Sequence, residues 1–262
     1  MAETEFISPW ASPPPAPPAP PASPPASQLI WAVASSLLFA LLLWWQVGWM
    51  WALAGVVGVF VHEYGHVLAI NAAGSGPGRI HFIPLLGGAA TMARPPQSQF
   101  KSVLIALAGP SFGLLATVPF FGMTLFTGDR AWLQGAFFIA AINLLNLVPA
   151  PPLDGAKALG PSLAWVHPLL ERGIVFAVGL LAVLWAASRQ DWIIALFIGI
   201  AALGGLRRPP MGRDLPPLSR SQWAISILCY LSALALCVLV LEQAAHGLGH
   251  NDPLKALSRF GV

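Results

Sequence analysis

Long apolar segments follow one another along most of this 262-residue chain, and they restrict its possible folds more than any other feature. Hydrophobic residues make up 56% of the sequence and charged residues only 9%, whereas a soluble domain carries about 25% charged residues. Inside a lipid bilayer the backbone polar groups must pair within the protein, so segments of this kind cross it as helices. The sequence therefore predicts an all-α polytopic membrane protein with about six to seven transmembrane helices, expected at residues 29–47, 49–71, 101–126, 131–148, 171–188, 191–206 and 222–243.

The remaining segments divide the chain further. Residues 1–27 are rich in proline and predict a disordered cytoplasmic tail, although a docking role for a proline-binding module is the alternative. No cleavable signal peptide is expected, because this stretch lacks a basic region before the first apolar segment. We predict a catalytic membrane core at 28–160, accessory transmembrane helices at 161–245 and a C-terminal tail at 246–262. Residues 74–99 hold too much glycine and proline for a helix, so we expect a re-entrant β-hairpin or loop at about 79–92, with a surface loop as the alternative.

Two histidines and a glutamate interrupt the second apolar segment, in the order His62-Glu63-Tyr64-Gly65-His66. Ionisable residues are costly in a membrane and are usually functional there, although polar residues capping a helix near the headgroups are the alternative. Residues four apart share one face of a helix, so His62 and His66 can bind one metal ion. Glu63 then lies beside the ion, where it can act as a general base toward water.

A catalytic zinc ion usually takes three protein ligands, so His62 and His66 require a third ligand from elsewhere in the chain. Asp154 is the best candidate, because it follows the fourth predicted span and reaches the same membrane face as His66. His81 in the re-entrant stretch is an alternative third ligand. A second pair, His246 and His250, is also four apart, but its two intervening glycines favour a solvated tail over a second metal site.

Two asparagines precede Asp154. Asn146 can donate a hydrogen bond to a developing oxyanion near the metal, and Asn143 is a weaker candidate for a similar role. Hydrogen bonding between neighbouring helices is the alternative for both amides.

These motifs together resemble the site-2 protease family of intramembrane zinc metalloproteases. The resemblance rests on H-E-Y-G-H at 62–66, Ala108-Gly109-Pro110 at the opening of the next helix, and N-L-V-P-A-P-P-L-D-G at 146–155. The stretch I-P-L-L-G-G-A-A at 83–90 also matches the family pattern. Two positions depart from it: Gly113 stands where the family has asparagine after A-G-P, and Ala156 stands where it has a second glycine after L-D-G.

The resemblance implies one Zn²⁺ per chain, held by His62, His66 and Asp154, with Glu63 as general base and Asn146 as a catalytic contact to the substrate. It implies hydrolysis of a peptide bond in or near the transmembrane segment of a membrane protein, as in regulated intramembrane proteolysis. We expect the unwound substrate segment to pair with the strand-like stretch 80–86. The predicted substrate-binding residues are Ile80, Phe82, Pro84, Gly87, Gly88 and Asn143.

Nine of the 13 basic residues fall on the side of the membrane that holds the N-terminus. By the positive-inside rule this side is cytoplasmic. We therefore expect an integral protein of a bacterial cytoplasmic membrane, with its active site toward the cytoplasm. Its predicted partners are the lipid bilayer and a transmembrane protein substrate, a homo-oligomer is left open, and no nucleic-acid partner is predicted.

Other functions remain as alternatives. A metal transporter would carry ionisable residues through several spans, and the first, fifth and seventh spans have almost none. A non-proteolytic scaffold that binds membrane helices would not require Glu63. A different class of membrane zinc protease would take its third ligand from a glutamate downstream, for which Glu171 is the candidate.

Overall fold

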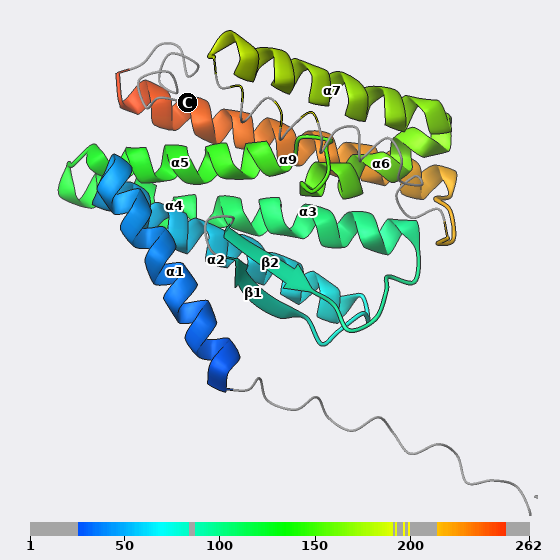
Figure 1. The fold of residues 1–262 in the computed structure, drawn as a ribbon, viewed down its shortest axis with the longest axis horizontal. Helices are drawn as coiled ribbons and strands as arrows, with labels where there is room; N and C mark the ends of the chain where they lie inside the picture. The colour runs from blue at the N-terminus through cyan, green and yellow to red at the C-terminus, as the bar shows by residue number, and fades with distance from the viewer. Residues whose placement is uncertain are drawn as a thin grey trace, which may run out of the picture.

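The computed structural model describes residues 26–83, 87–190 and 214–249, together with the single positions 192, 196 and 199. Most of these residues are helical, and one short antiparallel hairpin interrupts the helices (Figure 1). The elements are α1 (Ala26–Val47), α2 (Trp49–Ala72), β1 (Arg79–Ile83), β2 (Gly87–Thr91), α3 (Gln99–Leu115), α4 (Thr117–Thr127), α5 (Ala131–Asn146), α6 (Asp154–Val166), α7 (Pro168–Ser188) and α9 (Arg220–Gly247).

Four stretches of helix are long and apolar enough to cross a bilayer: Trp49–Ala72, Gln99–Thr127, Pro168–Trp185 and Arg220–Gly247. Two shorter apolar helical stretches, Val33–Gln46 and Ala131–Asn146, accompany them. The predicted all-α polytopic membrane fold is therefore confirmed. The predicted span at 191–206 lies almost entirely outside the described residues.

The chain turns sharply between the first two helices. Gly48 adopts a positive φ of 107°, which favours glycine, and α2 begins at the next residue. A Cβ atom at Gly55 of α2 would lie 2.6 Å from Leu43 Cδ1, so the two helices pack closely just beyond the turn.

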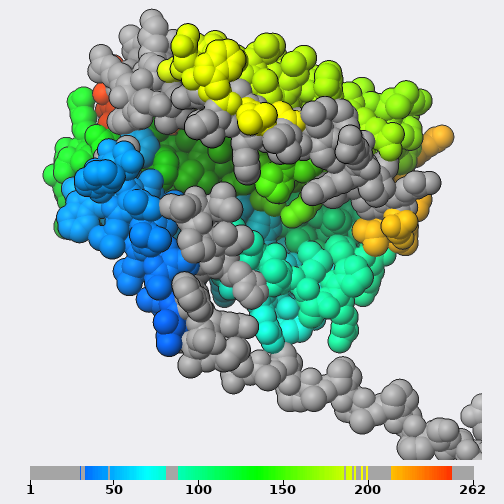
Figure 2. All heavy atoms as spheres, viewed as in Figure 1, coloured from blue at the N-terminus to red at the C-terminus, as the bar shows by residue number. Residues whose placement is uncertain are grey.

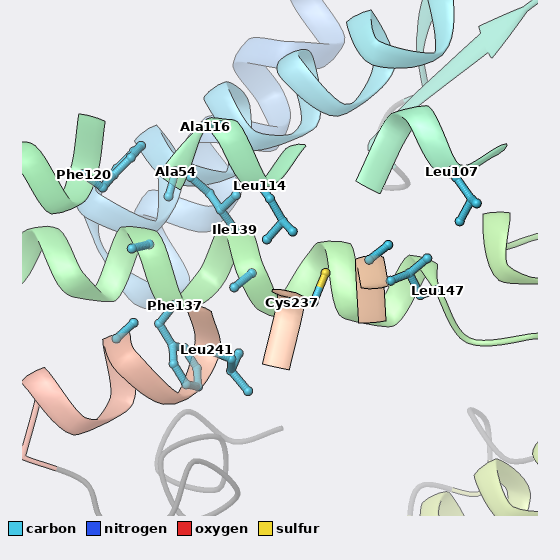
Figure 3. Packing of buried hydrophobic residues seen from close by; sticks show 14 of the residues in the cluster. Ala54, Leu107, Leu114, Ala116, Phe120, Phe137, Ile139, Leu147, Cys237 and Leu241 are labelled. Carbon is cyan, nitrogen blue, oxygen red and sulfur yellow. The ribbon is translucent and has the colours of Figure 1, made fainter. Parts of the chain in front are cut away.

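Helices α2, α3, α5 and α9 share the buried core (Figure 3). Phe137 of α5 and Cys237 of α9 are completely buried in it, as is Ala54 of α2. A Cβ at Gly65 would lie 2.6 Å from the Ala108 carbonyl oxygen, so α2 and α3 also approach closely beside the H-E-Y-G-H motif. Helix α9 lies far along the chain, yet it packs directly against α3 and α5.

The β-hairpin lies against α2, with Ile80 opposite Ala90 and Phe82 opposite Gly88. Its strands fall inside the predicted range 79–92, so the expected hairpin is confirmed; its position relative to a membrane stays a prediction. Residues 84–86, including Pro84, lie outside the described residues.

Two helical features were not predicted from the sequence. The third predicted span is divided into α3 and α4 at Ala116, where the Thr117 hydroxyl donates to the Leu114 carbonyl over 2.7 Å. Asp154 begins a short helix, α6, which lies between the fourth and fifth predicted spans. The proposed division into core and accessory helices stays a prediction.

Candidate metal centre and active-site pocket

His62 and His66 lie one turn apart on the buried face of α2. Their exposed fractions are 4% and 6%, and their Nε2 atoms lie 3.2 Å apart. Two imidazoles in this position direct both Nε2 atoms to one point. The helical spacing of the motif thus produces the pair of ligand atoms that the sequence predicted.

Asp154 completes this arrangement from the start of α6. Its Oδ2 atom lies 3.0 Å from His62 Nε2 and 3.1 Å from His66 Nε2. A tetrahedral ion with bonds of about 2.0–2.1 Å separates its ligand atoms by roughly 3.3 Å, so the three atoms have the spacing of zinc ligands. Within the described part of the chain, this is the one group of three or more such residues that can hold a metal ion.

A glycine keeps the centre of this group open. A Cβ atom at Gly109 of α3 would overlap the His66 ring and lie 2.8 Å from His62 Nε2. Gly109 belongs to the Ala108-Gly109-Pro110 motif, which the sequence singled out without a structural reason. The structure supplies that reason, because a larger residue would fill the space beside both imidazoles.

The Nδ1 atom of each imidazole lies within hydrogen-bond distance of an oxygen acceptor. His62 Nδ1 lies 2.9 Å from Asn143 Oδ1, and His66 Nδ1 lies 2.7 Å from the Ile105 carbonyl oxygen. Asn143 Nδ2 donates to the Ile139 carbonyl over 2.7 Å, which directs its Oδ1 toward His62. Each Nδ1 therefore carries the proton and each Nε2 presents a lone pair, which is the tautomer that a metal requires.

Asp154 is suited to an anionic ligand role. Burial alone would raise the pKa of its carboxyl, but the adjacent imidazoles of His62 and His66 outweigh this effect and hold that pKa well below its usual range. Its place in the first turn of α6 also favours the negative charge, because the helix dipole is positive there.

Glu63 lies beside the three ligands and is itself 6% exposed. The backbone amide of Ala90 in β2 donates to its carboxylate, while Oε2 has no hydrogen-bond partner among the described residues. Gly88 lies directly against this side chain, since a Cβ there would overlap Glu63 Cγ. Strand β2 thus fixes one carboxylate oxygen and leaves the other available for proton transfer.

A cavity of about 420 Å³ opens onto Glu63 and the three ligands. Small residues of β2 form one wall, namely Gly88, Ala89 and Ala90, and Asn146 lies on another. The remaining lining residues are Ile70, Met92, Ser102, Ile105, Ala106, Pro152, Leu153 and Lys157. This pocket is large enough for a short stretch of extended polypeptide beside the ligands.

The other predicted site residues are distributed unevenly. Asn146 and Gly88 line the pocket, whereas Asn143 is 1% exposed and contacts His62 instead. Ile80 is half-buried in β1, and Phe82 and Gly87 belong to the hairpin, but their side-chain surroundings are not described. The functional roles assigned to these residues stay predictions.

The alternative histidine sites gain no support. The metal-ligand group in the described part of the chain does not contain His246. His246 lies in the last turn of α9. The His81 side chain and His250 lie outside the description.

Sequence reasoning missed several residues around the site. The Ile105 carbonyl carries no side-chain signal, so it could not have been identified. Lys157 could have been found, because it follows Asp154 by three residues and shares its side of a helix once α6 is recognised.

The fold and the site together define a polytopic membrane protein with a buried His-His-Asp metal centre and an adjacent glutamate. Residues 33–152 match the model of the Peptidase M50B-like family. The chain is also 30% identical over 178 residues to a Synechocystis protein named "Putative zinc metalloprotease sll0528", an alignment that covers 64% of this chain and 43% of that protein. The chain therefore spans less than half the length of this relative. Both matches confirm the resemblance to the site-2 protease family.

Proposed function

We propose that this protein is an intramembrane zinc metalloprotease that hydrolyses a peptide bond in or near the transmembrane segment of a membrane protein. One observation carries the proposal: three ligand atoms lie within 3.0–3.2 Å of one another at the wall of a cavity, beside a Glu63 oxygen that has no hydrogen-bond partner in the described part of the chain. The family match and the name of the relative support the same activity.

The donor set of His62, His66 and Asp154 fits one zinc ion per chain. When bound, Zn²⁺ supplies Lewis acidity that polarises a carbonyl and makes water acidic enough to act near neutral pH. Both histidines already present the correct tautomer, and Gly109 leaves room beside them. The chain's own residues must then move the protons and hold the substrate.

Glu63 is the proton carrier. As the water oxygen forms its bond to the scissile carbonyl carbon, Glu63 Oε2 accepts the water proton. The carbon–nitrogen bond then breaks, and Glu63 returns the proton to the leaving amine. The small residues of β2 let the strand lie directly against this carboxylate at the cavity wall.

Asn146 is placed to stabilise the oxyanion. Its amide lines the cavity and donates to the Ile142 carbonyl of its own helix over 3.2 Å, a long hydrogen bond that it can exchange for one to the substrate. Such a bond is strongest when negative charge develops on the carbonyl oxygen.

Strand β2 offers a backbone surface for the substrate. It pairs with β1 along one side, and its small residues Gly88–Ala90 form the cavity wall beside Glu63. A helical substrate must unwind before its carbonyls are accessible, and an extended segment can pair with a strand edge. We assign this role to β2 rather than to 80–86 as a whole, because β2 is the strand that lines the cavity.

The proposed setting is a bacterial cytoplasmic membrane, with the site toward the cytoplasm, in regulated intramembrane proteolysis of a membrane-tethered protein. The purified protein would be incorporated into liposomes with the solubilised membrane proteins of its host. New N-termini would then be labelled and identified by mass spectrometry.

We expect new termini within or beside transmembrane segments for the zinc-loaded protein. Glu63→Gln should retain zinc and reduce cleavage by about 10²-fold or more, because a general base contributes that much. Zinc-loaded protein that produces no new termini, or equal cleavage by Glu63→Gln, would contradict the proposal. Zinc flux into the liposomes would favour a transporter, and capture of a membrane helix without cleavage would favour a scaffold.

A further inference from the structure

The third ligand depends on the connection between α5 and α6. Helix α5 ends at Asn146, and the next residue, Leu147, is completely buried. Gly155, the neighbour of Asp154, lies directly against the Leu147 carbonyl, because a Cβ atom there would overlap it. The position of this carbonyl therefore limits where the Asp154 backbone can lie.

The connection cannot satisfy this carbonyl by itself. The last carbonyls of a helix lack partners within the helix. A helical bond to Leu147 would come from the amide of residue 151, but that residue is proline and has no N–H. A buried carbonyl without a partner is unfavourable, so a donor from elsewhere is needed.

Tyr230 of α9 provides that donor. Its hydroxyl donates to the Leu147 carbonyl oxygen over 2.6 Å, and the side chain is only 6% exposed. The contact joins residues 83 positions apart in sequence, and Tyr230 lies well beyond the residues 33–152 that match the family model.

Helix α9 also contacts α6 near the C-terminal end of α6. Trp223 Nε1 donates to the Ser162 carbonyl over 3.1 Å, and the indoles of Trp223 and Trp165 stack with centroids 5.3 Å apart. Trp165 Nε1 donates in turn to the Leu218 carbonyl over 3.1 Å, just before α9. The C-terminal half of the helix that begins at Asp154 is therefore held by α9 and by Leu218 just before it.

We propose that Tyr230 is a positioning residue for the metal centre. Its hydroxyl fixes the Leu147 carbonyl, Gly155 packs against that carbonyl, and Asp154 Oδ2 is thereby placed between the two imidazoles. The inference rests on the proposed metal site but not on peptide-bond hydrolysis. Helix α9 thereby helps to position the third ligand of the metal centre without contributing a ligand itself.

The test compares zinc affinity by chelator competition in the purified full-length protein. Tyr230→Phe removes only the hydroxyl and should weaken zinc binding about 10-fold, the lower end of the effect of losing a direct partner of a metal ligand, because Tyr230 acts through Leu147 and Gly155. Ser226→Ala is the matched control, since it removes another buried hydroxyl one turn earlier on α9. This control should bind zinc like the unaltered protein.

A double-variant cycle distinguishes a positioning role of Tyr230 from a role in overall stability alone. If Tyr230 acts through Asp154, Tyr230→Phe should have no further effect on zinc affinity in an Asp154→Ala background. The absorption spectrum of the Co²⁺-loaded protein should also change in Tyr230→Phe and not in Ser226→Ala. Unchanged affinity in Tyr230→Phe, or an equal loss in both backgrounds, would overturn the inference.

A second variant tests the same Leu147 carbonyl through its contact with Gly155. Gly155→Ala should weaken zinc binding at least as much as Tyr230→Phe, because its Cβ displaces the Leu147 carbonyl. Zinc affinity equal to that of the unaltered protein in Gly155→Ala would also overturn the inference. All these measurements use metal binding, so they remain interpretable if the protein does not cleave peptide bonds.

Discussion

At the scale of single residues, the two asparagines near the site have separate tasks. Asn143 holds the Nδ1 proton of His62, while Asn146 faces the cavity. The sequence predicted Asn146 as a catalytic contact and Asn143 as a substrate-binding residue, but it could not show that Asn143 contacts His62. Their difference depends on which neighbouring helix each one faces.

We predict that Asn143→Ala weakens zinc binding about 10-fold to 100-fold, because His62 loses the acceptor that fixes its tautomer. Asn146→Ala should bind zinc normally and lower kcat instead. Chelator competition and steady-state cleavage would be measured on both variants. Normal zinc affinity in Asn143→Ala, or zinc loss in Asn146→Ala, would contradict this assignment.

Gly113, which departs from the family pattern, is explained by the same amide. A Cβ at Gly113 would overlap the Asn143 side chain, so the amide of α5 occupies the space beside α3. We predict that Gly113→Ala lowers the free energy of unfolding by about 1–3 kcal/mol through overpacking. Adding Asn143→Ala should recover part of this loss, and additive effects in denaturant unfolding would argue against the contact.

At the scale of elements, the length of the apolar segments predicted the long helices reliably. It located α1, α2, α5, α7 and α9 closely, because a helix in lipid needs about 20 apolar residues. It failed for α6, a helix of 13 residues that is less apolar and follows several prolines. The H-E-Y-G-H spacing gave two ligand positions, but the outer contacts depend on tertiary packing that a single sequence does not contain.

The hairpin yields a prediction of its own. A Cβ at Gly88 would overlap Glu63, so Gly88→Ala should displace the proton carrier while leaving the metal ligands in place. Displacement of a catalytic group by about 1 Å costs roughly 100-fold in rate, so we expect about that loss in kcat with zinc affinity unchanged. Thr91→Ala, on the same strand but outside the cavity lining, is the control. Equal activity of Gly88→Ala and the control would contradict the role of β2.

At the scale of the whole molecule, α7 lies along the top of the view in Figure 2, and α1 lies at its lower left. The two ends of α2 differ in character. Trp44, Trp45 and Trp49 are exposed around the turn at its beginning, while His66 and the hairpin lie toward its end. Exposed tryptophans gather at membrane interfaces, so we predict that the turn at Gly48 lies at the membrane interface opposite the metal centre.

The predicted orientation can be tested with single cysteines in intact bacterial cells. Cys229 and Cys237 would first be replaced by serine, since they are the two cysteines of the chain. We then expect Gln46→Cys, beside the exposed turn, to react with a membrane-impermeant maleimide added outside. Gln97→Cys, on the side that carries most basic residues, should react only after the membrane is opened. The reverse pattern would place the metal centre on the outer face, and it would exclude cleavage of substrates from the cytoplasmic side.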